Sequence, residues 1–314
     1  MKQFLALALM VPLTACFDDS EDTSIEVTGE LPSTSSGFSE TAGLANAGAL
    51  VGNDTKEVFG ESLTSNAFSG GSANSFSTGI QSRELLSPPQ NCDSSGTVSL
   101  DVSDKALTFI FEECLSDNTE IDGRLGFTIT GDLETFAENI VGDAIDLSLN
   151  ADYQNIKVTT GSEYLNLDGN ITTRYQISST DWGYGISSSA LEYSDSNDHD
   201  FTLNNYNLEM QGDFLVGEAS DGTSWSYDYF ITNSDGTFHV QSDGDIQLHD
   251  SSNELRTGTI LIEGTNATLA ITLNAEAENV DDQVNFSLDL GKDGTEDVTG
   301  TTSQATFYGW PQAF

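Results

Sequence analysis

An acidic loop near the C-terminus has the residue types and the spacing of a calcium site. The segment DLGKDGTED, residues 289–297, places carboxylates at loop positions 1, 5 and 9 and a glycine at position 6, as calcium-binding loops do. Positions 3 and 12 are Gly291 and Gly300, so two of the usual side-chain ligands are missing. We expect either a weak calcium site or a solvated Asp-Gly hairpin turn. The candidate ligands are Asp289, Asp293, Thr295 and Asp297.

The other residues of catalytic type do not form a recognisable active site. His239 and His249 flank two aspartates in the segment HVQSDGDIQLH, but a zinc site needs three or four ligands within tetrahedral reach. A glycosidase needs two carboxylates about 5–10 Å apart, one of them desolvated, and the acidic residues here lie almost entirely in polar surroundings. We therefore expect no catalytic residue, and the sequence assigns no ligand-binding residue.

The charge of the chain argues against polyanionic partners. The sequence has 51 Asp and Glu residues and 9 Lys and Arg residues, which give a formal net charge of −42 at pH 7. A field of this sign repels nucleic acid, anionic headgroups and acidic polysaccharides. The acidic residues are spread along the chain, as in proteins that stay soluble in salty surroundings, where ions screen the self-repulsion. We expect no nucleic-acid partner.

Alternating apolar and polar residues predict that β-strands position these side chains. In residues 145–153, Ile, Leu, Leu, Ala and Tyr alternate with Asp, Ser, Asn and Asp, so one face of a strand is apolar and the other polar. The same alternation recurs in residues 165–177, 225–231 and 284–290. Turn signals such as Ser234-Asp235-Gly236 separate the runs and are typical of hairpins.

Interruptions of the pattern predict bulges. The phase of the alternation slips between Phe201 and Phe214, which a β-bulge near Asn204-Asn205 would explain. Four glycines within strand patterns recur at intervals of 46, 43 and 46 residues, and a glycine inside a strand marks a bulge, a bend or a close backbone approach. These glycines are Gly123, Gly169, Gly212 and Gly258. The four segments that contain these glycines either form a stacked repeat or simply reflect the frequent glycines of an all-β chain.

Aromatic residues fall into two groups. Trp225, Tyr227 and Tyr229 share the apolar positions of their strand pattern and are assigned to the core. Trp182 and Tyr184 lie in the segment DWGY, which favours a turn, where Trp182 could stack on a ligand such as a carbohydrate.

The sequence divides into four parts. Residues 1–15 have the pattern of a signal peptide, and residues 16–37 are acidic, rich in Ser and Thr and short of aromatics, which predicts a disordered tether. Residues 38–91 are rich in Ala, Gly and Ser, and we expect weak helices or a linker. Residues 92–314 predict an antiparallel, hairpin-rich all-β meander, built as a curled sheet, an open barrel or a sandwich.

The N-terminus has the pattern of a secretory signal. Lys2 supplies the positive charge, and residues 4–13 form an apolar run that is too short to span a bilayer. The segment Leu13-Thr14-Ala15-Cys16 resembles the lipobox of bacterial lipoproteins. This resemblance implies cleavage before Cys16, lipidation of its thiol with palmitate-type chains, and attachment to the membrane through them.

The same resemblance sets the expected compartment. Phe17 follows the cysteine where lipoproteins retained in the inner membrane often carry Asp, which favours the outer membrane of a Gram-negative bacterium, on its periplasmic or surface face. With Cys16 lipidated in an oxidising compartment, two cysteines remain. The resemblance therefore implies a disulfide between Cys92 and Cys114, worth about 3 kcal/mol.

The lipobox, the acidic linker, the Cys-bounded first hairpin and the repeated hairpins together resemble an all-β family of Gram-negative envelope lipoproteins, to which no activity is attached. We expect a non-catalytic, lipid-anchored envelope protein that acts as a binding or scaffolding module at the outer membrane and has no obligatory cofactor. Its partners would be the membrane and an envelope protein. Two alternatives stay open: a carrier that holds a lipid or hydrophobic ligand in a curled sheet, and a hydrolase of polysaccharides.

Overall fold

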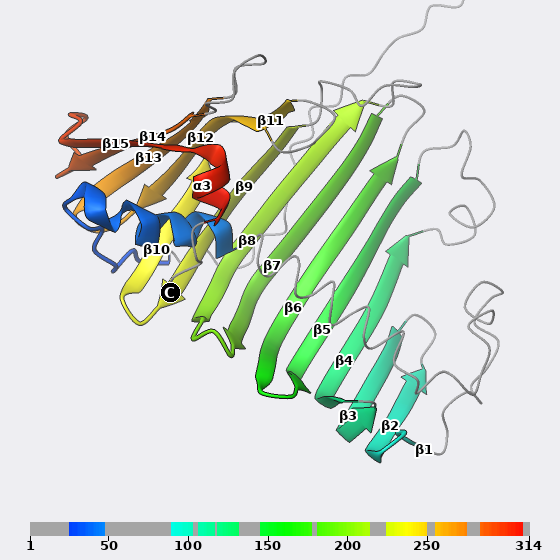
Figure 1. Ribbon diagram of the computed structural model, residues 1–314. Coiled ribbons are helices and arrows are strands. Elements are labelled where there is room, and N and C mark those ends of the chain that lie inside the picture. The colour runs from blue at the N-terminus through cyan, green and yellow to red at the C-terminus, as the bar shows by residue number, and fades with distance from the viewer. Residues whose placement is uncertain are drawn as a thin grey trace, which may run out of the picture.

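The computed structural model describes residues 25–47, 89–102, 106–116, 118–131, 145–177, 181–213, 224–249, 255–274 and 283–309. Within them the chain forms one antiparallel sheet of 15 strands, with helical segments against one face (Figure 1). The strands are β1 (Gln90–Asn91), β2 (Ser95–Val102), β3 (Ala106–Ser116), β4 (Thr119–Gly131), β5 (Ile145–Thr160), β6 (Glu163–Ile177), β7 (Asp181–Asp195), β8 (Asp200–Asp213), β9 (Ser224–Asn233), β10 (Gly236–Ser242), β11 (Ile246–His249), β12 (Leu255–Glu263), β13 (Ala267–Asn274), β14 (Gln283–Leu290) and β15 (Val298–Ser303). The helical segments are η1 (Ser35–Gly37), an α-helix through residues 38–47, and α3 (Gln304–Gly309).

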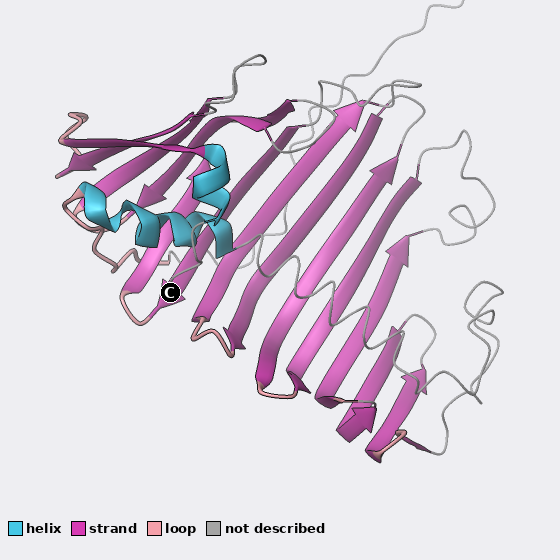
Figure 2. Ribbon diagram, in the orientation of Figure 1, coloured by secondary structure: helices cyan, strands magenta, loops and turns pink. Residues whose placement is uncertain are grey.

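The order of the strands in space follows their order in the chain. The path runs from β1 to β10 and on through β12 to β15, while β11 pairs with β12 and β9. β1 and β15 stand at the two ends of this path, so the sheet is an open meander. Figure 2 shows that strands dominate the described chain. The predicted antiparallel all-β fold is confirmed, in the form of a single curled sheet.

Alternation of side chains explains why these segments form strands. In β13, Leu269, Ile271 and Leu273 are at most 1 % exposed, and the residues between them are only partly buried. Successive side chains of a strand point to opposite faces, so one face of the sheet is apolar. Burying that face provides most of the driving force for folding. The predicted core positions of Tyr229 and Ile231 are confirmed, since both are buried. Trp225 and Tyr227, assigned to the same face, are only partly buried and pack against this core.

The helix at residues 38–47 covers the apolar face of the C-terminal strands. The Phe38 ring stacks on Phe286 of β14, with ring centroids 5.2 Å apart. At the other end of the helix, the Tyr229 hydroxyl of β9 donates a 2.7 Å hydrogen bond to the carbonyl of Leu44. The sheet therefore curls around one short helix (Figure 1).

The prediction of a disordered tether is wrong for residues 25–37, which lie against the sheet. The backbone N–H groups of Thr28 and Gly29 both donate to the Thr237 carbonyl of β10 at 3.0 Å. Leu31 is 4 % exposed, and its N–H donates to the side chain of Asn266. The amino-acid composition shows only how much apolar surface a segment can bury within itself. Residues 25–37 are instead ordered by their contacts with the sheet.

α3 closes the C-terminal edge of the same core. Phe307 is fully buried and packs against Phe286, with ring centroids 6.2 Å apart. Among the residues that the structure describes, no helix is long and apolar enough to cross a membrane.

The bulge predicted at Asn204-Asn205 is confirmed. The β8–β9 register shifts between Asn204 and Asn207, and Asn205 has a positive φ of 49°. The extra residue restores the phase, so that Leu203 and Leu208 lie opposite Ile231 and Tyr227 on the same apolar face. The slip in the sequence pattern is therefore a property of the backbone.

Two of the four repeated glycines belong to a recurring bulge device. Gly123 and Gly169 have φ values of 108° and 128°, and each follows an aspartate that accepts a backbone N–H from a bulge in the preceding strand. Asp168 accepts the N–H of Asn155 at 2.7 Å, and Asp122 accepts that of Glu113 at 3.1 Å. The 46-residue interval between these glycines therefore corresponds to one hairpin.

The other two repeated glycines have different surroundings. Gly258, with a φ of 144°, approaches Ile246 of β11. Gly212 lies in a regular ladder opposite Trp182. The Asp-Gly pair that accepts a bulge N–H therefore recurs at Gly123 and Gly169, and the segment around Gly212 does not have it.

The disulfide between Cys92 and Cys114 is confirmed. Cys92 directly follows β1, and Cys114 lies in β3, so the bond joins two strands that flank β2. Both residues are buried. The disulfide thus secures the edge of the sheet, where a strand of two residues would otherwise have few partners.

Candidate ligand-binding site

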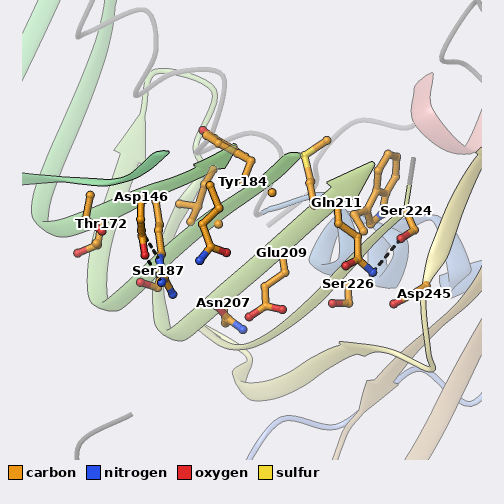
Figure 3. Close-up of a pocket in the computed structure, with 18 of the residues that line it drawn as sticks. Asp146, Thr172, Tyr184, Ser187, Asn207, Glu209, Gln211, Ser224, Ser226 and Asp245 are labelled. Atoms are coloured by element: carbon orange, nitrogen blue, oxygen red, sulfur yellow. Dashed lines mark hydrogen bonds and ion pairs between the residues drawn. The ribbon is translucent and has the colours of Figure 1, made fainter. Parts of the chain in front are cut away.

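A hollow of about 670 Å³ lies over six neighbouring strands, β4 to β9. Pockets that hold small ligands have volumes of roughly 300–1,000 Å³, so its size suits a ligand. Figure 3 shows the labelled side chains of Glu209, Asn207 and Ser226 on one side of the sheet and Tyr184 on the other. The hollow is therefore on the polar face, opposite the face that the helix covers.

Strand register arranges the residues of the hollow in rows across the sheet. In one row Gly183 of β7 lies between Gln176 of β6 and Gln211 of β8. In the next row Gly185 lies between Arg174 and Glu209. Long polar side chains of β6 and β8 thus stand on both sides of β7, which carries glycine at the two positions between them.

Gly183 and Gly185 form the floor of a trench along β7. A Cβ at Gly183 would find its nearest neighbours at 3.6 Å on Gln176, and one at Gly185 would find the Leu208 carbonyl oxygen at 3.8 Å. Both are ordinary van der Waals distances, so packing alone does not require glycine here. A glycine inside a strand destabilises it by roughly 0.5–1 kcal/mol relative to Ala, and it often marks the approach of a ligand.

Apart from Arg174, Asp146, Glu209 and Asp245, the polar lining consists of uncharged groups. It offers amides and hydroxyls, which can both donate and accept hydrogen bonds. These residues are Gln176, Asn207, Gln211, Thr130, Ser148, Thr172, Ser187, Ser224 and Ser226. Gln211 Nε2 donates to Ser224 Oγ at 3.4 Å (Figure 3), a long hydrogen bond that a ligand could replace.

The basic residue of the lining, Arg174, is engaged by Asp146. Its Nε and Nη2 donate to the two oxygens of Asp146 at 3.0 and 2.7 Å. The hydrogen bond from Arg174 lowers the pKa of Asp146, so this carboxyl is ionised over a wide pH range. Its side chain and that of Arg174 are 56 % and 43 % exposed, so the pair is solvent-screened and contributes little to stability.

The four predicted calcium ligands lie at the end of β14 and in the turn that follows it, where the three aspartates accept backbone hydrogen bonds. Asp289 accepts the N–H groups of Asp293 and Gly294 at 3.1 and 2.7 Å. Asp293 accepts that of Thr295 at 2.9 Å, and Asp297 that of Leu290 at 2.8 Å. This is the geometry of an Asp-Gly turn. No group of three or more His, Cys, Asp or Glu suited to a metal occurs among the described residues, and the calcium site stays a prediction.

The two histidines considered for zinc have other surroundings. His239 Nε2 lies 2.7 Å from Asp228, and its ring stacks on Phe230. The hydrogen bond to Asp228 raises the pKa of His239. The side chain of His249 lies outside the described residues, so the prediction that the two imidazoles lie near each other is not tested.

A third histidine forms a compact polar cluster at the β7–β8 turn. His199 Nδ1 lies 2.7 Å from Asp195, which also accepts the hydroxyl of Tyr193 and the N–H of Asn197. Burial raises the pKa of Asp195, whereas the hydrogen bonds from His199 and from backbone N–H groups lower it. The lowering is the larger effect, so the net shift of the pKa is downward. The cluster holds the turn in place.

The turn predicted around Trp182 is wrong, because β7 begins at Asp181 and pairs on both sides. Tyr184 lies opposite Tyr175 and Met210 in that ladder, on the apolar side of the sheet. The sequence signal that was missed is the alternation Gly183-Tyr184-Gly185, which puts two glycines on one face. Cys16, the predicted lipidation site, lies outside the described residues.

No family model, no curated protein and no solved structure matches this chain. The function must therefore be inferred from the site itself.

Proposed function

We propose that the protein is a non-catalytic, lipid-anchored envelope protein that binds its ligand or partner through the hollow over β7. The observation that carries this proposal is the pair of glycines at the floor, Gly183 and Gly185. Neither is required by packing, and both lie between long polar side chains of β6 and β8. A sheet gains no stability from such a trench, so a ligand is the best reason for it.

The pairing of Asp146 with Arg174 supports a binding role over a hydrolytic one. Glycoside hydrolysis needs a carboxylic acid with a raised pKa. The pKa of Asp146 is shifted in the opposite direction by Arg174, and Glu209 is exposed. The side chains that β6 and β8 place beside Gly183 and Gly185 are polar and stand on the face opposite the apolar core. This arrangement gives less support to a carrier of hydrophobic ligands.

Membrane attachment rests on the lipobox-like segment that ends at Cys16. Cells that express the full-length chain are grown with a clickable palmitate analogue, and the protein is isolated. We expect label in the wild type, no label in Cys16→Ser, and unchanged label in Cys92→Ser. An unlabelled wild-type protein would contradict the anchoring.

The binding role is tested by photo-crosslinking in intact envelopes. A benzophenone amino acid replaces Ser187, which continues the floor of the trench, or Glu192, an exposed residue of the same strand outside the hollow. We expect a crosslinked envelope component at position 187 and none at position 192. Equal crosslinking at both positions, or none at either, would refute the role of the hollow.

A further inference from the structure

We infer that the ligand of this hollow is an uncharged glycan chain that lies along β7. This inference rests on the proposed binding function and names its ligand class. The first argument is charge. Arg174 is the basic residue of the lining, and Asp146 holds it through two hydrogen bonds. Glu209 and Asp245 add negative charge, and the chain carries −42. No described residue of the lining offers a free cation, so an anionic ligand would meet uncompensated repulsion.

The second argument is the hydrogen-bonding character of the lining. Sugar hydroxyls both donate and accept, and so do the amides and hydroxyls of the lining. Gln176 and Gln211 stand on opposite sides of Gly183, so one ring above this glycine can reach an amide on each side. Ser187, lying between Thr172 and Asn207, offers a third such row.

The third argument is shape. The walls of the trench rise from β6 and β8, whose backbones are two strand spacings apart, roughly 10 Å. The floor from Gly183 to Ser187 covers four residue steps, roughly 14 Å. A trench of this form accepts one extended chain lying parallel to β7. With no side chain at positions 183 and 185, the C–H face of a sugar ring can rest directly on the backbone.

A peptide strand fits these observations less well. Strand addition uses the free N–H and C=O groups of a sheet edge, but β7 pairs on both sides, with β6 and β8. A cationic polymer is favoured by the charge but does not need the amides or the glycine floor. Charge and hydroxyl recognition can therefore be separated by experiment.

The test is isothermal titration calorimetry on the full-length protein in a detergent whose headgroup contains no sugar. The neutral probes are cellopentaose, laminaripentaose, maltopentaose and penta-N-acetylchitopentaose. The charged probes are pentagalacturonate and the chitosan pentamer, which has the chitopentaose backbone with free amino groups. We expect at least one neutral pentasaccharide to bind, with an affinity that does not change between low and high salt, and pentagalacturonate not to bind.

Two variants locate the binding. Gly185→Thr places a side chain in the trench and should raise the Kd by about tenfold or more, which corresponds to about 1.4 kcal/mol. Gly126→Thr is the matched control: Gly126 lies mid-strand in β4, its added Cβ also meets only ordinary contacts, and it is not part of the lining. Gln176→Ala, which keeps the floor open, should weaken the same probe. Urea unfolding confirms that each variant folds.

Three outcomes would overturn the glycan assignment. They are the absence of binding by all four neutral probes, tighter and salt-sensitive binding of the chitosan pentamer, and equal affinity in Gly185→Thr and Gly126→Thr. Crosslinking at position 187 together with any of these results would leave the binding function standing and exclude only the glycan. Absence of that crosslink would instead remove the proposed function.

Discussion

Replacing Gly169 by Ala tests whether the Asp-Gly bulges shape the sheet. Gly169 has a φ of 128°, a region that residues with a Cβ rarely occupy. The added Cβ would lie 2.3 Å from the carbonyl oxygen of Ala190 and 2.9 Å from the Cα of Leu191, and both are backbone atoms of β7. Backbone strain of roughly 1–3 kcal/mol and overpacking of roughly 1–3 kcal/mol give an expected loss of about 2–6 kcal/mol.

Two other glycines provide the controls. Gly161, in the β5–β6 turn, has a φ of 64°, and nothing lies within 4 Å of an added Cβ. Its replacement by Ala should destabilise by about 1 kcal/mol, since the left-handed conformation costs roughly 1–2 kcal/mol and the stiffer unfolded chain offsets part of it. Gly185 has no positive φ, and an added Cβ there makes only ordinary contacts. Gly185→Ala should therefore stabilise the protein by roughly 0.4–1 kcal/mol.

The assay is equilibrium unfolding in urea, followed by far-ultraviolet circular dichroism on the full-length protein and the three variants. We expect the midpoint order Gly185→Ala, wild type, Gly161→Ala, Gly169→Ala, from the most to the least stable. If Gly169→Ala and Gly161→Ala unfold at the same urea concentration, the close approach of β6 to β7 has no energetic weight and the reasoning about bulges fails.

Three further predictions concern other contacts. Cys92→Ser together with Cys114→Ser should lower the free energy of unfolding by about 3 kcal/mol, and an unchanged value under oxidising conditions would contradict the role of the disulfide. Tyr229→Phe leaves a buried helix carbonyl without its donor, so unfolding should become easier by about 1–3 kcal/mol and amide exchange in residues 38–47 should accelerate; unaltered exchange there would argue against the docking. Because its folded-state pKa is raised, His239 stabilises fully below its unfolded pKa, and this contribution disappears as the pH rises through the folded pKa. An NMR titration should give a pKa above 6.5 in the wild type and a lower one in Asp228→Asn, and equal values would rule out this pair.

The strand regions and the core followed from local pattern. Alternation with period two needs only neighbouring residues, so Val284, Phe286 and Leu288, which are buried, could be assigned to one face before any pairing was known. The bulge at Asn204-Asn205 was predicted for the same reason, because an extra residue leaves its trace in the phase of the pattern. The order of strands followed the simplest expectation for hairpins, in which each strand pairs with the next.

Features that depend on contacts distant in sequence could not be predicted. The ordering of residues 25–37 comes from Thr237 and Asn266, more than 200 residues away, and nothing in the segment itself indicates it. The hollow is likewise a product of register: Gly185 becomes a trench floor only because pairing places Arg174 and Glu209 beside it. The Asp-Gly turn at residues 289–297 could be predicted from the sequence, but whether its aspartates bind an ion or their own backbone is decided by loop geometry.

The most direct test of the account is competition for the crosslink at position 187. Envelopes that contain the full-length protein with the benzophenone residue in place of Ser187 are irradiated with and without an excess of the neutral pentasaccharide that binds best. The account predicts that the crosslinked envelope component disappears in the presence of the sugar and persists with pentagalacturonate. Undiminished crosslinking in the presence of the bound neutral sugar would contradict it.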